Sequence, residues 1–532
     1  MPRLHLLCAP ALLLFAFLTA GAQPGKLPAK LPLSNLAPAK ALPDLCVLRY
    51  RVSTSSPECQ KYFDQGLGYF YSYVWMEAAR SFETALQYDP DCAMAWWGLS
   101  RGLESWNKRD ASDKALQKAK DKLAGASHRE QLLIKARLQE KGMEPNIAED
   151  ARRKTAAKTI DDLLVLYDDD EEAWFARAKL ADSGTAAVPY YKALLRVNPL
   201  HPGANHELVH FYENIRRPAL GWVNAEKYIE SSPGQPHAFH MQGHLAMRLG
   251  RWEKTADRAT KAIDLQRAYH KEQGVRPAED HQFSHHLETL LLALTHDGRF
   301  AEARKIKAEA QAANYKHPLP WFRLHLAERN WAEAQKTIDQ FRKTDKQTTA
   351  YLTAILHLRQ GNHERAAPEV DVLRHAYQSG KSNKELEQRL WETQGMLMCQ
   401  TGSSDPGLKL IAKTVDRTKD DYKHHAWGNG AYFMETWGIA ALKSGQDEIA
   451  EEAFLEALAH EPSCVRGALG MQVLCERQSR PEEAKQYAEL AKRCWPRADA
   501  GALESELAFL REPFPVMRIP VEPKVIIESS ER

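Results

Sequence analysis

The sequence lacks an excess of charge of either sign. Its 532 residues include 72 lysines and arginines against 70 aspartates and glutamates, which leaves a formal net charge of +2. A protein that holds nucleic acid or anionic lipid electrostatically needs a strongly basic surface, so we expect no nucleic-acid partner. With 44% hydrophobic and 27% charged residues, the composition is typical of a soluble globular chain rather than a disordered or multi-span membrane protein.

Several catalytic motifs are also missing. The sequence has no Cys-x-x-Cys pair, haem attachment motif, phosphate-binding glycine loop or serine elbow, which excludes thiol redox catalysis and nucleotide-driven chemistry. Seven cysteines follow Cys8, an odd number. Among them, Cys464 opens a predicted helix and Cys494 closes its antiparallel partner, which makes these two the candidates for a disulfide.

Long apolar runs are confined to the N-terminus. Arg3 precedes an apolar run over residues 6–18 and the small residues 20–22, the pattern of a cleavable secretory signal. The run is shorter than the roughly 20 residues of a membrane-spanning helix. We therefore predict a signal peptide over 1–22, a periplasmic or secreted protein, and no integral membrane segment after cleavage. Residues 23–58 are rich in proline, which favours an extended spacer and N-terminal segment.

A series of small, aromatic and proline residues recurs along the chain. In its first copy, Gly66 and Ala78 are small where two antiparallel helices would cross, Phe82 would pack onto the next unit, and Pro90 would end the second helix. The spacing is that of a helix-turn-helix unit of about 34 residues. The series returns as Gly438, Ala450, Phe454, Ala457 and Pro462, and as Ala484, Ala488, Ala491 and Pro496.

These residues resemble the tetratricopeptide repeat family over about 59–496. The segments 63–66 and 89–98 are similar to exported bacterial members of unassigned function. The resemblance implies an all-α fold, a right-handed superhelical solenoid of antiparallel helix pairs, whose first helices line a concave groove used for binding. Beyond residue 496 the helical period fades among prolines, which predicts an extended tail over 499–532.

The repeats fall into three sections by composition. We expect N-terminal repeats over 59–200, histidine-rich repeats over 201–317 and C-terminal repeats over 318–498. The middle section stands out because 11 of the 21 histidines lie between His201 and His296, where even spreading would place about 4.

Within this section the histidines follow helical spacing. His237, His240 and His244 recur at i, i+3 and i+7 and therefore share one stripe of a helix, away from the packing stripe. One repeat earlier, the stripe holds His206, His210 and Glu213. One repeat later, it holds His281, His285 and Glu288, with His286 turned away.

First helices of neighbouring repeats stand about 10 Å apart, so we expect the three stripes to converge on one centre in the groove. Imidazoles supplemented by carboxylates suit Zn, Cu or Fe and disfavour Ca or Mg. The candidate ligands are His206, His210, Glu213, His237, His240, His244, His281, His285 and Glu288. The other interpretation is a polar groove in which the histidines are hydrogen-bonding groups for a peptide or a small molecule.

Residues 206–210 also match H-E-x-x-H, in which two histidines bind zinc and the glutamate is the general base of a hydrolase. The surrounding sequence predicts repeat helices rather than the sheet edge that presents substrate in such hydrolases. Two groove ligands flanking Glu207 are therefore the favoured interpretation. If the protein is an enzyme, its metal either lowers the pKa of bound water, with Glu207 as base, or activates oxygen as a redox centre.

The sequence thus leaves two functions open. The first is an exported repeat protein that binds a transition metal in its groove, with hydrolytic or redox chemistry on a small-molecule substrate as its extension. The second is a scaffold without metal that binds a peptide or a partner helix in the groove.

Overall fold

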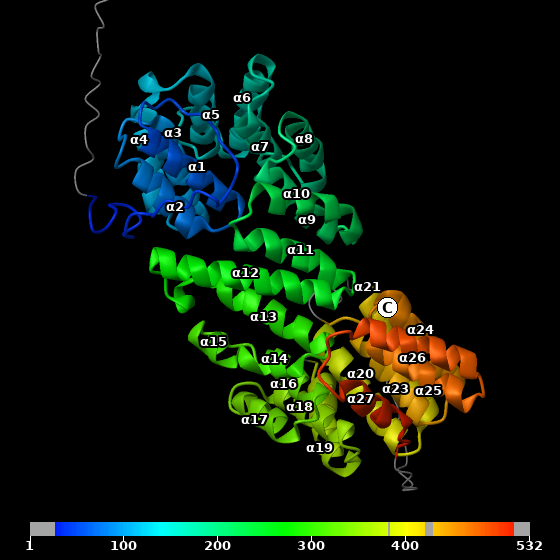
Figure 1. The fold of residues 1–532 in the computed structure, drawn as a ribbon. Coiled ribbons are helices and arrows are strands. Elements are labelled where there is room, and N and C mark those ends of the chain that lie inside the picture. Colours follow the sequence, from blue (N-terminus) through cyan, green and yellow to red (C-terminus); the bar gives the residue numbers. More distant parts are fainter. Residues whose placement is uncertain (1–26, 381–382, 421–428, 515–532) are drawn as a thin grey trace, which may run out of the picture.

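The computed structural model describes residues 27–380, 383–420 and 429–514, and within these ranges the chain forms helices and no strand. The helices follow one another as antiparallel pairs in an elongated solenoid (Figure 1), which confirms the predicted all-α repeat architecture. The predicted signal peptide lies outside the described residues. No helix in the described part of the chain combines the length and apolar character that a bilayer crossing requires.

The N-terminal section consists of α1 to α8. Serine and aspartate side chains start several of these helices; for example, Ser56 accepts a hydrogen bond from the backbone N–H of Cys59, and Asp170 from that of Ala173. The bounds are α1 (Pro57–Tyr71), α2 (Trp75–Ala85), α3 (Ala93–Ser105), α4 (Arg109–Asp121), α5 (His128–Glu140), α6 (Arg152–Leu166), α7 (Glu171–Lys179) and α8 (Gly184–Val197).

The middle section contains the histidine-bearing helices, and the C-terminal section follows it. The middle comprises α9 (Pro202–Asn214), α10 (Trp222–Ser231), α11 (Pro236–Arg248), α12 (Trp252–Gln273), α13 (His281–His296), α14 (Phe300–Lys305) and α15 (Lys307–Ala312). The C-terminal section comprises α16 (Leu319–Ala327), α17 (Trp331–Phe341), α18 (Lys346–Arg359), α19 (His363–Gln378), α20 (Lys384–Gln400), α21 (Ser404–Asp420), α23 (Tyr432–Lys443), α24 (Asp447–His460), α25 (Val465–Arg477), α26 (Pro481–Cys494) and α27 (Ala502–Arg511).

The repeat signature has the packing role predicted for it. A Cβ placed on Gly66 would lie 2.7 Å from the Phe82 ring, and one on Gly98 of the next repeat would lie 2.6 Å from the same ring. Phe82 of the second helix α2 is therefore clamped between glycines of two successive first helices, α1 and α3. Near the C-terminus Phe454 is held in the same way between Gly438 and Gly470, at 2.6 and 2.3 Å.

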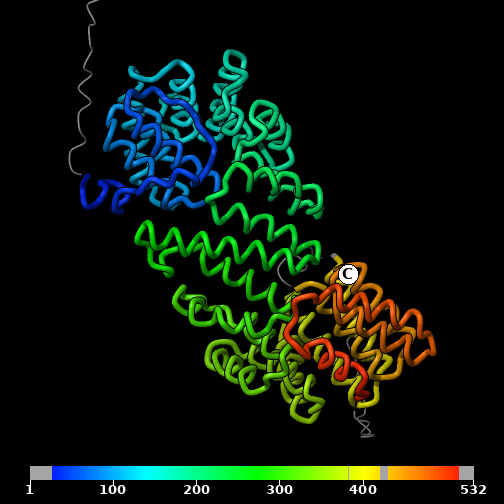
Figure 2. Tube along the Cα trace, viewed as in Figure 1, coloured from blue at the N-terminus to red at the C-terminus, as the bar shows by residue number. Residues whose placement is uncertain are grey.

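The proline-rich segment before α1 is not a spacer. Over residues 27–56 it lies along the first repeats (Figure 2), where Leu31 and Tyr50 are buried. The backbone N–H of Val47 donates to the carbonyl of Ser231, 2.8 Å away, and so ties this segment to the end of α10. The prediction of a spacer is wrong for these residues because their leucines and tyrosine bury enough apolar surface to fix the chain.

The C-terminal repeats fold back onto the middle of the molecule. The indole N–H of Trp495 donates to the carbonyl of His296 at 2.6 Å, and the backbone N–H of Asp499 donates to the carbonyl of Gly298 at 2.9 Å. The predicted extended tail is wrong over Ala502–Arg511, which form α27, and its remainder over 515–532 lies outside the described residues. These contacts hold the histidine-bearing helices between two packed sections.

The proposed disulfide is not formed. Cys464 and Cys494 are both free thiols. The sulfur of Cys464 accepts the backbone N–H of Gly467 at 3.3 Å and so caps α25, whereas that of Cys494 lies 3.8 Å from the carbonyl of Pro462. Because both thiols are free, the prediction of a bridge between them is wrong.

Candidate metal centre

Three first helices carry the candidate ligands and lie in succession across the middle of the molecule: α9, α11 and α13 (Figure 1). Proline occupies the first turn of α9 and of α11, where its missing N–H costs nothing. Asp280 starts α13 by accepting the backbone N–H of Gln282 at 3.0 Å. Helix α11 lies between the other two and is buried over Pro236–Met247, so its histidines face protein on every side.

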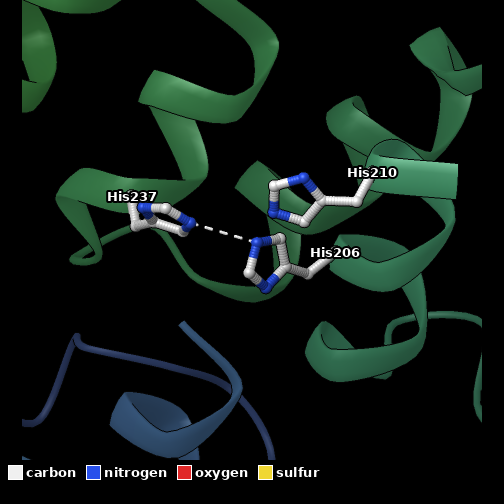
Figure 3. A group of neighbouring side chains, drawn as sticks. All are labelled: His206, His210 and His237. Atoms are coloured by element: carbon white, nitrogen blue, oxygen red, sulfur yellow. Dashed lines mark hydrogen bonds between the residues drawn. The ribbon is translucent and has the colours of Figure 1, made fainter. Parts of the chain in front are cut away.

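His206, His210 and His237 form the first triad. One potential ligand nitrogen of each residue lies within 4.8 Å of the other two. Figure 3 shows His206 and His210 extending from α9 toward His237 on α11, and the two Nε2 atoms of His206 and His237 are 3.0 Å apart. Two nitrogens bound to one tetrahedral Zn²⁺ at the usual bond length would be separated by about 3.3 Å. The first triad is thus close to the spacing of a metal-bound set.

A hydrogen bond fixes which nitrogen of His206 carries the lone pair, and two other nitrogens of the first triad have no partner within the described residues. Nδ1 of His206 lies 2.6 Å from the carbonyl oxygen of Tyr71, which only accepts, so this nitrogen is protonated and Nε2 carries the lone pair. Nδ1 of His237 and Nε2 of His210 are buried without a hydrogen-bond partner. A buried polar atom left unpaired costs roughly 1–3 kcal/mol, so this arrangement is expensive for a protein that only packs its core.

The charge state of the first triad suits a cation. Burial, followed by the neighbouring imidazoles, lowers the pKa of His206 and of His237 well below the ordinary histidine value. Both rings are therefore neutral at pH 7, which is the form that binds a metal ion.

His240, His244 and His285 form the second triad, again with one ligand nitrogen of each within 4.8 Å of the others. The ring centroid of His240 lies 4.2 Å from that of His244 and 4.7 Å from that of His285. Burial first, and the neighbouring imidazoles second, lower the pKa of His240 well below its ordinary value. The structure therefore divides the six histidines into two groups, with α11 contributing to both, instead of one common centre.

Glu213 lies behind both triads rather than within either. Its Oε1 is 3.0 Å from Nδ1 of His244, and its Oε2 is 3.4 Å from Nδ1 of His210. Arg248 holds the same carboxylate through Nε at 2.6 Å. Burial would raise the pKa of Glu213, but the opposing effect of His244, His210 and Arg248 holds it below its usual range. The ionised carboxylate orients one imidazole of each triad, as outer carboxylates do in metal sites.

The remaining carboxylates and one histidine of the predicted set lie outside the triads. Glu288 accepts the hydroxyl of Tyr315 at 3.0 Å and lies 3.7 Å from Nδ1 of His285. The ring of His281 stacks on Trp75, with centroids 6.3 Å apart and planes 10° from parallel. The stripe of α13 thus brings only His285 into a triad.

Glu207, the predicted general base, is held by other partners. Its Oε1 accepts the hydroxyl of Tyr73 at 2.9 Å and pairs with Nζ of Lys179 at 3.0 Å. Tyr73 in turn lies against the first triad, with its ring centroid 4.5 Å from that of His206. The carboxylate adjoins the first triad, but its charge is compensated by the lysine.

His286 was expected to turn away from the centre, and this expectation is wrong. The side chain is fully buried, and its ring centroid lies 4.1 Å from that of His240. Helical periodicity missed this contact because it compares residues of one helix only, whereas His286 reaches its neighbour on α11. Tyr71 and Tyr73, from the first repeat, were missed for the same reason, and no spacing in the sequence connects them to residue 206.

A separate cavity of about 810 Å³ lies among the C-terminal repeats and is bordered by α27. Three cationic side chains line it: Arg329, Arg359 and Lys443. Lys443 donates to the carbonyl of Glu512 at 2.6 Å, and burial lowers its pKa to about 8. Arg359 makes no hydrogen bond or ion pair within the part of the chain that the structure describes.

The match to a family model supports the repeat assignment. A family model described as "Tetratricopeptide repeat" matches residues 63–104, 319–380 and 436–499. No curated protein matches the chain. Among solved structures, a human IFIT1 dimer with m7Gppp-AAAA shares 13% identity, covering 83% of this chain and 90% of that one at a TM-score of 0.27. The APC/C hetero-tetramer Cut9-Hcn1 shares 12% identity, covering 85% and 76% at a TM-score of 0.29.

Proposed function

We propose that this tetratricopeptide repeat protein binds transition-metal ions through its histidine triads. The observation that carries the proposal is the approach of two ring nitrogens from different helices, Nε2 of His206 with its lone pair and Nε2 of His237, at 3.0 Å. The contact is bridged either by a proton on Nε2 of His237 or, once that proton is displaced, by a cation that both nitrogens bind. The buried and unpartnered Nε2 of His210 beside them supplies a third nitrogen.

The donor set points to the class of ion. Each triad offers nitrogens only, and Glu213 stands behind the imidazoles with its charge matched by Arg248. Neutral nitrogen donors suit Zn, Cu or Fe, whereas Ca²⁺ and Mg²⁺ require oxygen. We propose Zn²⁺ or a copper ion as the first candidates, because a three-imidazole set is a known arrangement for zinc and imidazole is among the ligands that copper favours.

A site with three protein ligands has room for a further ligand, and a bound ion there would supply Lewis-acid or redox chemistry to it. This chain's own contribution is to orient the imidazoles through Tyr71 and Glu213 and to exclude water by burying α11. We assign no general base, because Lys179 and Tyr73 hold Glu207. The proposal therefore includes both hydrolytic chemistry and oxygen activation at the bound ion.

The proposal is tested by elemental analysis of protein purified without chelators. We expect a stoichiometric transition metal in the wild type and its loss from the first triad in the variant His206→Ala/His237→Ala. The control is His128→Ala, an exposed histidine that pairs with Tyr167. A wild type that takes up no Zn²⁺ or copper at micromolar concentration, even after reconstitution, would show that the triads have no metal function.

The location of the site follows from the predicted signal over 1–22, which would export the protein. Export would place the triads in a compartment where copper and zinc reach them without cytosolic buffering. Fractionation of the host, with an antibody against the mature chain, tests this location. Recovery of the uncleaved chain in the cytosol would reject it.

A second function is favoured by the cationic cavity among the C-terminal repeats. Tetratricopeptide repeats present extended concave surfaces to protein partners, and here the half-buried guanidinium of Arg359, which forms no direct ion pair in the described part of the chain, lines an 810 Å³ space together with Arg329 and Lys443. We propose that this cavity receives an acidic peptide. Fluorescence anisotropy with labelled peptides that differ only in their acidic side chains should show binding that Arg359→Ala weakens at least tenfold. Equal affinity for the neutral peptide would contradict this role.

A further inference from the structure

We propose that His286 is a fourth imidazole ligand at the second triad, so that the second site closes around its ion with four nitrogens while the first keeps three. The inference rests on the proposed metal binding and adds to it an unequal division of roles between the two sites. It is carried by the position of His286, by its fixed tautomer and by the lack of any partner for its second nitrogen.

The position comes first. His286 follows the triad ligand His285 directly on α13, and its ring contacts that of His240 on α11. The ring centroid lies 4.1 Å from that of His240, and 6.3 Å both from that of His285 in the second triad and from that of His237 in the first. Its nearest imidazole is therefore His240, a member of the second triad.

The tautomer is fixed by a chain of hydrogen bonds from α12. Nδ1 of His286 lies 2.7 Å from Oε1 of Gln266, and Nε2 of Gln266 donates to Oδ2 of Asp280 at 2.8 Å. Because a carboxylate accepts, the amide of Gln266 must turn its NH₂ toward Asp280 and its oxygen toward His286. Nδ1 of His286 therefore carries the proton, and Nε2 carries the lone pair.

The remaining nitrogen has no hydrogen-bond partner among the described residues. Nε2 of His286 is buried, and the nearby Nδ1 of His240 is buried and unpartnered as well. A histidine kept only for packing would not need hydrogen bonds through Gln266 and Asp280 to fix its tautomer. It would also not place an unused lone pair in the core. A buried lone pair on a ring that packs against His240, with the opposite nitrogen hydrogen-bonded to an oxygen, is the arrangement of a metal ligand.

The difference in ligand number separates the roles of the two sites. Closed sites with four protein ligands hold structure, whereas sites with three leave a position for water or substrate. The second site would then fix α11 against α13, and the first would be the place where an added ligand binds. Any chemistry of this protein is therefore assigned to His206, His210 and His237.

The test isolates the second site in the full-length chain. In the background His206→Ala/His237→Ala, the second site is titrated with Co²⁺, whose visible absorption is intense for four-coordinate tetrahedral geometry and weak for five or six ligands. We expect the intense bands in this background. Adding His286→Leu should abolish them and weaken Co²⁺ binding at least tenfold, because leucine keeps the volume but offers no nitrogen. His281→Leu, on the same helix but outside both triads, is the matched control.

Two further measurements keep the result clear. First, the metal-free forms of His286→Leu and His281→Leu are compared by circular dichroism and thermal unfolding. Second, Gln266→Leu retains the imidazole of His286 but no longer fixes its tautomer, so it should weaken Co²⁺ binding by less than His286→Leu. An unchanged Co²⁺ spectrum and affinity in His286→Leu overturns the fourth ligand while leaving metal binding intact. Failure of the unmutated protein to bind Co²⁺ or Zn²⁺ overturns the proposed function itself, and the inference falls with it.

Discussion

The first helices of the repeats at the two ends of the chain and helix α11 of the histidine-bearing section pack differently. At the ends, Gly66 and Gly438 face the rings of Phe82 and Phe454, closer than a Cβ could approach. In the middle, a Cβ on Gly243 of α11 would meet nothing nearer than 3.6 Å. The end repeats are thus held by a tight aromatic contact that α11 does not make.

This difference shows what the middle repeats gain. Helix α11 is buried over nearly its full length and yet devotes three of its positions to imidazoles, two of which have nitrogens without hydrogen-bond partners, His237 and His240. Buried unpaired polar groups destabilise a fold. The end repeats therefore provide stability, and the middle repeats accept a cost that metal ligation would offset.

The largest loss of stability is expected when a phenylalanine ring held between two glycines is removed. Phe454→Ala should lower the free energy of unfolding by about 3–5 kcal/mol, because the fully buried ring leaves a cavity between two glycines that cannot close. Urea denaturation followed by circular dichroism measures it. His286→Leu in the metal-free protein is the comparison from the middle section and should cost far less. Equal losses in the two variants would remove the distinction between the sections.

The sequence predicted the end repeats better than the middle. Gly438 and Phe454 were assigned their crossing and packing roles from spacing alone, because neighbouring repeats present the same faces to each other. Helical spacing also selected the six histidines of the two triads. It could not divide them into two groups, since that division depends on the offset between α9, α11 and α13, which no single helix encodes.

Two other errors have physical causes of the same kind. His286 was assigned to the wrong side because a helical wheel treats its helix as isolated, whereas Gln266 on the preceding helix turns the ring toward α11. The segment before α1 was expected to be an extended spacer from its prolines, but Leu31 and Tyr50 pack into the repeats. Contacts between elements far apart in sequence decided both.

The next effect concerns the carboxylate shared by the two triads. Glu213→Gln should weaken metal binding at both sites by about 10–100-fold, because the amide cannot serve as a charged acceptor for His210 and His244 at once. Isothermal titration with Zn²⁺ measures each affinity. Glu288→Gln is the control, since that carboxylate pairs with Tyr315 and only approaches His285. A loss at one site alone would show that Glu213 does not serve both triads.

The dependence of stability on pH should differ in sign between the sections. Burial lowers the pKa of His206 and of His240 in the folded protein, so below about pH 6.5 the unfolded chain binds more protons than the folded one. The free energy of unfolding then falls as the pH drops, by up to about 1.4 kcal/mol per pH unit for each histidine.

In the C-terminal section the opposite holds for Glu461. Burial raises its pKa to about 7, so between its ordinary value and pH 7 the folded state binds the extra proton and stability falls as the pH rises. Glu461→Gln should therefore remove a loss of stability between about pH 4.5 and 7. Urea denaturation at several pH values measures both slopes. A variant that leaves the slope unchanged in that range would show that Glu461 is ionised in the folded protein.

The smallest expected change in stability most directly distinguishes α11 from the first helices of the end repeats. Gly243→Ala should stabilise the protein by about 0.5–1 kcal/mol, because alanine loses less backbone entropy in a helix and its Cβ finds only ordinary contacts at 3.6 Å. Gly438→Ala should destabilise it, because the new Cβ would lie 2.6 Å from a ring that Gly470 holds from the other side. The two substitutions are chemically identical, so helix propensity contributes equally to both. Opposite shifts of the unfolding temperature in the two variants would therefore report only the contact between the phenylalanine ring and its flanking glycines. A stabilising Gly438→Ala would mean that the ring of Phe454 can move aside.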